Sequence, residues 1–265
     1  MRDITLEELL EAGCHFGHQV NRRNPKADEY IYEARSNVHI INLEKTREGL
    51  VNAAKYLKDL SAQGGSLIIV GTKRQAKTIV EDEVKRADGA GAKNLYHITA
   101  RWVGGMLTNN QEISKNGEKL KKLNELLAAG TRSGYTKREL LLMEREKEKL
   151  RSLYGGVAGL KGFPDALYIV GTQLEETAVK EAYESGVPIV GIVDTNADPS
   201  KIKYPIPAND DAVKSISLIT SYLVDAWIEG QKEAAKNAEK AEAAEKKEKE
   251  KKEKPAKETK EEVKA

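Results

Sequence analysis

Residues 66–72 read Ser66-Leu67-Ile68-Ile69-Val70-Gly71-Thr72, and this stretch decides the fold class of the chain. Its apolar run does not alternate with polar residues, which is typical of a parallel strand buried on both faces. A close match, Leu167-Tyr168-Ile169-Val170-Gly171-Thr172, occurs later in the chain. Each copy ends a predicted strand and enters a predicted helix, so shared turn mechanics explain the match without a duplication.

Strands and helices alternate outward from these two stretches. Predicted strands cover residues 38–41, 66–70, 95–98, 166–170 and 188–193, and residues 204–207 form a short extended piece. Predicted helices cover residues 43–62, 73–87, 174–185 and 209–229, and a short capped helix opens at Thr5 and ends at Gly13. Such alternation predicts an α/β fold with a parallel sheet and helices on both faces.

A charge-rich segment at residues 111–154 interrupts this alternation of strands and helices. Ile113, Leu120 and Leu127 are spaced by seven residues, and Met143 and Leu150 repeat the spacing in a second charge-rich stretch. This period predicts an inserted antiparallel coiled-coil hairpin, with helices over 111–129 and 136–154. The α/β domain then comprises residues 1–110 and 155–230. Residues 231–265, rich in Lys, Glu and Ala, are expected to form a disordered tail.

Composition limits the classes of protein to which the chain can belong. Its only cysteine, Cys14, excludes an internal disulfide framework, and no apolar run reaches the roughly 18–20 residues of a membrane helix. We therefore expect a cytoplasmic protein with no membrane partner. Net charge is only +2, but residues 112–151 hold 11 basic against 7 acidic residues, whereas residues 156–230 hold 5 against 11. One part of the chain therefore suits a polyanion and the other would repel it.

The segment Arg101-Trp102-Val103-Gly104-Gly105-Met106-Leu107-Thr108-Asn109-Asn110 has the chemistry of binding rather than of catalysis. Arginine binds phosphate, tryptophan stacks on bases, and paired glycines let the backbone approach a bulky surface. The segment contains no nucleophile–base pair, carboxylate or metal ligand. Other cations fall in the first polar loop and at the start of the helix after residue 72. Together they make polyanion binding the favoured hypothesis, with these candidate residues: Arg22, Arg23, Asn24, Lys26, Arg35, Lys73, Arg74, Arg101, Trp102 and Asn109.

Catalytic, nucleotide and metal sites find less support. The chain lacks a G-x-G-x-x-G turn after a strand and a G-x-x-x-x-G-K-[ST] loop, so we expect no nucleotide cofactor. Cys14, His15 and His18, completed by Asp194 or Asp198, are the candidate metal ligands, but they lack the paired spacing of structural zinc sites. Packed histidines and a plain turn after a strand are the favoured interpretation. The chain is therefore predicted not to be an enzyme, with no cofactor, no resident metal and no small-molecule substrate.

Eight segments in order resemble the small-subunit ribosomal protein S-two family in its bacterial form. They are residues 13–19 (Gly-Cys-His-Phe-Gly-His-Gln), 24–26, 38–46, 70–73, 101–109, 164–167, 192–199 and 206–212. The resemblance covers about residues 4–230. It implies a flavodoxin-like parallel sheet with a protruding helical hairpin, and no catalytic activity.

The same resemblance implies the partners. Family members bind small-subunit ribosomal RNA, lie among other small-subunit proteins and help to recruit the mRNA-binding protein S-one, so a ribosomal, cytoplasmic location is expected. An alternative from a different class stays open at this point, namely a small-molecule or nucleotide-binding flavodoxin-like enzyme with its site at the carboxyl edge of the sheet.

Overall fold

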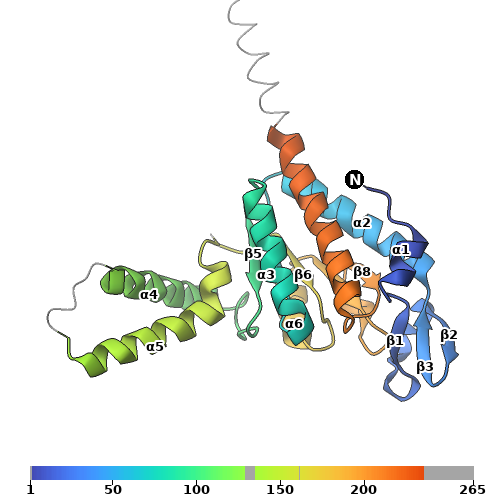
Figure 1. The fold of residues 1–265 in the computed structure, drawn as a ribbon, viewed down its shortest axis with the longest axis horizontal. Helices are drawn as coiled ribbons and strands as arrows, with labels where there is room; N and C mark the ends of the chain where they lie inside the picture. The colour runs from blue at the N-terminus through green and yellow to red at the C-terminus, as the bar shows by residue number, and fades with distance from the viewer. Residues whose placement is uncertain (1, 129–134, 161, 236–265) are drawn as a thin grey trace, which may run out of the picture.

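A five-stranded parallel sheet forms the centre of the structure, a computed structural model that describes residues 2–128, 135–160 and 162–235 (Figure 1). Its order is β5-β4-β6-β7-β8. The strands are β4 (Leu67–Val70), β5 (Leu95–Ile98), β6 (Ala166–Ile169), β7 (Ile189–Val193) and β8 (Tyr204–Pro207). In chain sequence this order is second, first, third, fourth, fifth, which is the flavodoxin-like arrangement. The predicted α/β fold with a parallel sheet is thus confirmed, and its two matching stretches, β4 and β6, are neighbours.

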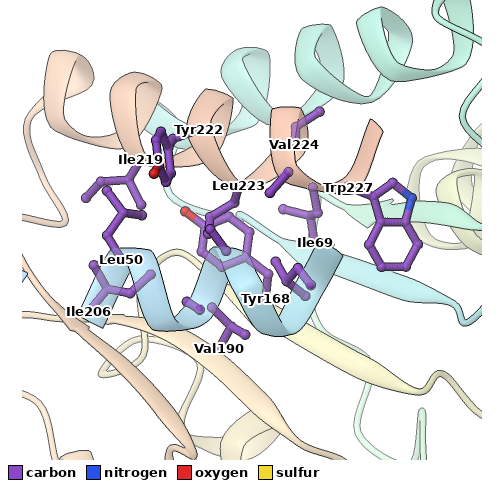
Figure 2. Close-up of a cluster of buried hydrophobic side chains, with 14 of the residues drawn as sticks. Leu50, Ile69, Tyr168, Val190, Ile206, Ile219, Tyr222, Leu223, Val224 and Trp227 are labelled. Carbon is purple, nitrogen blue, oxygen red and sulfur yellow. The ribbon is translucent and has the colours of Figure 1, made fainter. Parts of the chain in front are cut away.

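Three long helices cover one face of the sheet. They are α2 (Leu43–Ala62), α3 (Arg74–Gly89) and a C-terminal helix over residues 213–235, with the short α1 (Leu6–Glu11) beside them. Figure 2 shows Ile69, Tyr168 and Val190 of the strands meeting Leu223 and Trp227 of the C-terminal helix, all of them buried. Alternate residues of each strand point to this face, because side chains alternate along a strand.

The second face is covered by α6 (Glu176–Glu184) and the loop after β5, while α4 (Asn110–Ala128) and α5 (Lys137–Tyr154) extend away beside the sheet and contribute side chains to the same buried cluster. Trp102, Met106 and Leu107 of the loop share one buried cluster with Leu120 of α4 and Leu150 of α5. The helices α4 and α5 lie side by side (Figure 1). An ion pair joins Lys119 of α4 to Glu146 of α5. The side chain of Ile113 and residues 129–134 of the predicted connection (129–135) lie outside the described residues.

A second, antiparallel sheet was not expected from the sequence. It contains β1 (Phe16–Gln19), β2 (Ile31–Arg35) and β3 (Val38–Ile41) in the order β1-β3-β2, and only the β3 residues were predicted as a strand. The signal is weak because Tyr32 to Arg35 are all exposed and show no alternation of apolar residues. Ser36 and Asn37 have φ values of 51° and 64°, as a tight hairpin turn between β2 and β3 requires.

Two predictions in the C-terminal part of the chain also differ from the structure. The extended piece at 204–207 is a full edge strand, β8, where Pro205 and Pro207 suit an edge position. The C-terminal helix continues through residue 235, beyond the predicted boundary at Gln231. The Gln231 side chain explains this, since its Nε2 donates to the Lys93 carbonyl at 2.6 Å and its Oε1 accepts from the Lys93 N–H at 2.7 Å. The predicted tail from residue 236 onward lies outside the described residues.

Within the described ranges, none of the helices combines the length and the apolar composition that crossing a lipid bilayer would demand.

Two glycines in the middle of helices provide a matched test of the packing of α2 against β8. A Cβ atom at Gly49 would lie 2.4 Å from the Pro205 carbonyl oxygen, whereas one at Gly117 in α4 would meet nothing within 4 Å. We expect Gly49→Ala to lower the free energy of unfolding by about 1–3 kcal/mol through overpacking. Gly117→Ala should raise it by about 0.5–1 kcal/mol, since alanine is the better helix former. Urea denaturation would measure both, and equal effects would contradict the described packing.

Candidate nucleic-acid interface

The antiparallel sheet is attached to the parallel sheet at its carboxyl edge, which is the side on which the C-terminal ends of all five strands lie. Thr195, directly after Asp194 at the end of β7, is the point of attachment: its Oγ1 accepts from the His18 N–H at 2.9 Å, and its carbonyl accepts from the Asn24 N–H at 2.8 Å. A Cβ at Gly17 would lie 2.7 Å from the Thr195 Cγ2, so only glycine allows this approach. The first polar loop and the carboxyl edge therefore form one surface.

Five charged side chains form an edge cluster beneath this surface, defined here as His18, Lys73, Asp194, Asp210 and Asp211. The Lys73 Nζ lies 2.7 Å from Asp210 Oδ1 and 2.8 Å from Asp211 Oδ1. The His18 ring reaches Asp194 with Nδ1 at 3.0 Å and Asp211 with Nε2 at 3.4 Å. Asp194 and Asp210 are almost fully buried. Neither oxygen of Asp210 has a hydrogen-bond partner in the described part of the chain, so its contact with Lys73 is an ion pair rather than a directed hydrogen bond.

The environment of the edge cluster shifts the pKa values of its members. Burial raises the pKa of Asp210 to about 6, against the opposing effect of the Lys73 ammonium. The hydrogen bond to Asp194 raises the pKa of His18, although burial acts in the other direction. For Lys73, burial would lower the pKa, but Asp210 and Asp211 outweigh it and the pKa is raised. The cluster thus favours a charged His18 and a charged Lys73 among its carboxylates.

The predicted metal candidates separate into two groups. His18 and Asp194 come together and, with Asp210, place one ligand atom each within 4.8 Å of one another, so these three residues could hold a cation. His15 instead lies against the Phe16 ring at 4.0 Å between centroids, and Asp198 pairs with Lys26 at 2.7 Å. Cys14 is buried in the core of the α/β domain. The ammonium of Lys73 already supplies a positive charge beside Asp210.

The predicted binding residues also divide by exposure. Arg22, Arg35, Arg74, Arg101 and Asn109 expose their side chains to solvent. These five come from the first polar loop, β2, the start of α3 and the loop after β5. Arg23 and Lys26 are exposed as well but form ion pairs within the chain, so these five are the exposed candidates that take part in none of the described ion pairs.

The remaining candidates have partners within the chain. Arg23 pairs with Asp28 at 3.1 Å, and Lys26 pairs with Asp198 at 2.7 Å, both at the surface. The Asn24 side chain accepts from the Lys26 N–H and caps a short 3₁₀ helix. These interactions shape the loop on which Arg22 is presented.

Trp102 does not occupy the position expected of a base-stacking residue. Its side chain is 5% exposed and belongs to the buried cluster beneath the second face of the sheet. Its indole N–H donates to Glu181 Oε1 at 3.3 Å. Stacking on a base requires an open ring face, so the prediction that Trp102 binds RNA directly is replaced by a role in the core, and Arg101 is the exposed member of the pair.

Protein side chains fill the crevice in which doubly wound proteins bind small ligands. That crevice lies beyond the carboxyl ends of β4 and β6, where the strand order reverses. Here the Lys73 side chain passes over Gly171, where a Cβ would lie 3.0 Å from the Lys73 Cε. Beside it, the Thr72 hydroxyl donates to Glu175. The geometry therefore favours a binding surface over a ligand pocket at this edge.

Several residues that build the site were not predicted from the sequence. Asp210 and Asp211 follow β8, and they were overlooked because residues 204–207 were not recognised as a strand of the sheet. A carboxylate pair directly after a parallel strand is the signal that would have placed them at the carboxyl edge. Thr195 and Glu181 carry no comparable signal, because their importance depends on segments far away in the sequence.

The histidines provide a test of the electrostatics of the site. The pKa of His18 should lie above its ordinary value of 6.5, whereas burial lowers the pKa values of His15 and His97. Protonated His18 then stabilises the folded chain fully below pH 6.5, and this stabilisation is lost as the pH rises through the raised pKa. A histidine titration by NMR should show His18 as the group that titrates above the other two. A His18 titration below that of His15 would contradict the described cluster.

Comparison with known proteins agrees with the motifs and the fold. The family described as Ribosomal protein S2 matches residues 9–230. A protein named small ribosomal subunit protein uS2 from Azorhizobium caulinodans is 46% identical over 228 residues, which are 86% of this chain and 67% of the relative. Relatives with the same name are 44% identical over 230 residues in Geotalea uraniireducens and 45% over 228 residues in Sinorhizobium medicae. These two alignments span 87% and 86% of this chain, and 88% and 87% of the respective relatives. The chain therefore belongs to the ribosomal protein S2 family, in its bacterial form.

Proposed function

We propose that this chain is a structural constituent of the small ribosomal subunit and binds small-subunit ribosomal RNA at the carboxyl edge of its sheet. Membership of a family of ribosomal proteins supports the role in the subunit and a place on the cytoplasmic ribosome. The observation that carries the RNA contact is that exposed arginines lie after strands that end at this edge and on the antiparallel sheet and loop attached to it: Arg22, Arg35, Arg74 and Arg101.

The chemistry of these residues suits phosphate. Guanidinium groups keep their charge and offer a planar fork of donors to phosphate oxygens. Arg74 opens α3, where the positive end of the helix dipole adds to the attraction. Contacts of this kind fix the position of a protein on RNA without reading its sequence. Phosphate contacts that hold a protein in place without reading the RNA sequence suit a structural constituent of the subunit.

A catalytic role has no comparable support. Proteins of this family are structural constituents rather than enzymes, as the sequence also predicted. The alternative, a flavodoxin-like enzyme, needs a ligand in the crevice beyond β4 and β6, where Lys73, Thr72 and Glu175 already lie.

Protein partners are part of the same proposal. Apart from the aspartates that form ion pairs at the carboxyl edge, the acidic excess over residues 156–230 suits contacts with proteins or solvent rather than RNA, and we assign to it the neighbouring small-subunit proteins, including protein S-one. We also retain the division into an α/β domain of residues 1–110 and 155–230 and an inserted coiled-coil hairpin of residues 111–154. The contact between the two helices of the hairpin is supported by Leu120, Leu123 and Leu150, which are buried, and by the half-buried Met143.

Removal of one exposed arginine should weaken RNA binding measurably. We expect Arg101→Ala to lower the affinity for transcribed small-subunit ribosomal RNA and to reduce the slope of log K against log salt by about one unit, as the loss of one phosphate contact requires. Filter binding across a salt series would measure both quantities.

Lys85→Ala provides the control for this measurement. Lys85 is equally cationic and its side chain is 72% exposed, but it lies toward the C-terminal end of α3, at the opposite edge of the sheet from Arg74. Its removal should leave the salt slope unchanged. Equal slopes for the wild type and Arg101→Ala would remove Arg101 from the proposed interface.

A further inference from the structure

Glu181 is a buried carboxylate with an unusual set of partners. It lies on α6 and is only 8% exposed. Its Oε1 accepts from the Trp102 indole N–H at 3.3 Å and from the Gly105 N–H at 2.8 Å, and its Oε2 accepts from the Leu107 N–H at 3.3 Å. All three donors belong to the loop between β5 and α4. One side chain of α6 therefore fixes a loop that is remote from it in sequence.

The loop has the tight geometry that such an anchor can hold. Gly105 has a φ of +89°, which favours glycine, and its carbonyl accepts from the Asn109 N–H at 2.7 Å. Trp102, Met106 and Leu107 point into the buried cluster. Arg101 and Asn109 are exposed at the two ends of the same loop. Its inner side is thus packed and bonded, and its outer side presents polar groups.

We propose that Glu181 is a positioning residue for RNA binding, which holds the loop over residues 101–109 so that Arg101 faces the RNA. Because α4 begins at Asn110, the same carboxylate also sets the direction in which the helix pair α4–α5 leaves the sheet. This inference rests on the proposed function, since Glu181 itself is buried and acts only through the loop.

A carboxylate suits this task better than an amide or a shorter side chain. Three N–H donors converge on its two oxygens, and a carboxylate is an acceptor at both. Glu181→Gln keeps the shape but must turn an NH₂ group toward one of these donors. Glu181→Ala removes all three acceptor contacts. The two variants therefore form a graded series in which the glutamine form preserves the packing.

Hydrogen exchange tests the anchor independently of RNA. We expect the amides of Gly105 and Leu107 to exchange about tenfold faster in Glu181→Ala, with a smaller increase in Glu181→Gln, since each lost bond to a charged group favours local opening. The control is Glu184→Ala, which removes an exposed glutamate from the same helix. Unchanged exchange at both amides in Glu181→Ala would overturn the proposal.

A double-mutant cycle then tests whether the anchor acts through Arg101. Affinity for transcribed small-subunit ribosomal RNA is measured for the wild type, Glu181→Gln, Arg101→Ala and the double variant. If Glu181 positions Arg101, the fold-loss caused by Arg101→Ala should be clearly smaller in the Glu181→Gln background than in the wild type. A fully additive cycle would contradict positioning and leave Glu181 with a purely structural role.

The two measurements separate the two claims. Faster exchange together with no effect of Arg101→Ala on affinity would overturn the proposed RNA contact of Arg101, and with it the positioning role. An effect of Arg101→Ala combined with an additive cycle would overturn the role of Glu181 and leave the RNA contact standing.

Discussion

The ion pairs of Lys73 and His18 with three aspartates hold the carboxyl edge of the sheet together. They join four segments that are distant in sequence: β1, the start of α3, the end of β7 and the turn after β8. Charges buried at such a junction are costly unless they are paired, so the four segments can come together only in the arrangement that pairs them. The attachment of the antiparallel sheet through Thr195 depends on the same arrangement, because His18 contributes to both.

The ion pairs at this junction use some of the cationic side chains, and only the others stay available to contact a binding partner. Lys73 is used internally, Arg23 and Lys26 form pairs that shape the first loop, and the arginines left exposed come from different segments of the edge. The buried Trp102 and Glu181 play the corresponding part in the loop after β5, where internal contacts leave Arg101 outside. In both places the cations proposed to bind RNA are the exposed ones that the buried charges and donors of the chain do not use.

The sequence predicted the elements that depend on local pattern. The apolar runs of β4 and β6, the helix over Leu43–Ala62 and the capping box at Thr5 all lie where the residues placed them. Elements that depend on distant partners were missed. The strand β2 has no apolar alternation, and its identity rests on pairing with β3. Residues 204–207 become a strand only because β7 lies beside them.

For the site, too, features that depend on local sequence could be predicted and features that depend on distant partners could not. Composition alone led to the proposal that the cationic segments bind a polyanion, and Arg22, Arg74 and Arg101 are exposed, as such binding requires. Whether a given cation faces outward or pairs internally could not be predicted, because the partners of Lys73 follow β8, far along the chain. A tryptophan beside an arginine is equally typical of a base-stacking platform and of a buried core, and only the packing against Leu107 and Glu181 distinguishes them.

A density map of the small ribosomal subunit, purified from cells that carry this chain, would test the proposed RNA contact most directly. We expect density for the α/β domain with the carboxyl edge against RNA, and the guanidinium groups of Arg22 and Arg101 at about 2.7–3.2 Å from phosphate oxygens. A map of fully assembled subunits in which this edge faces solvent, or in which the chain is absent, would contradict it.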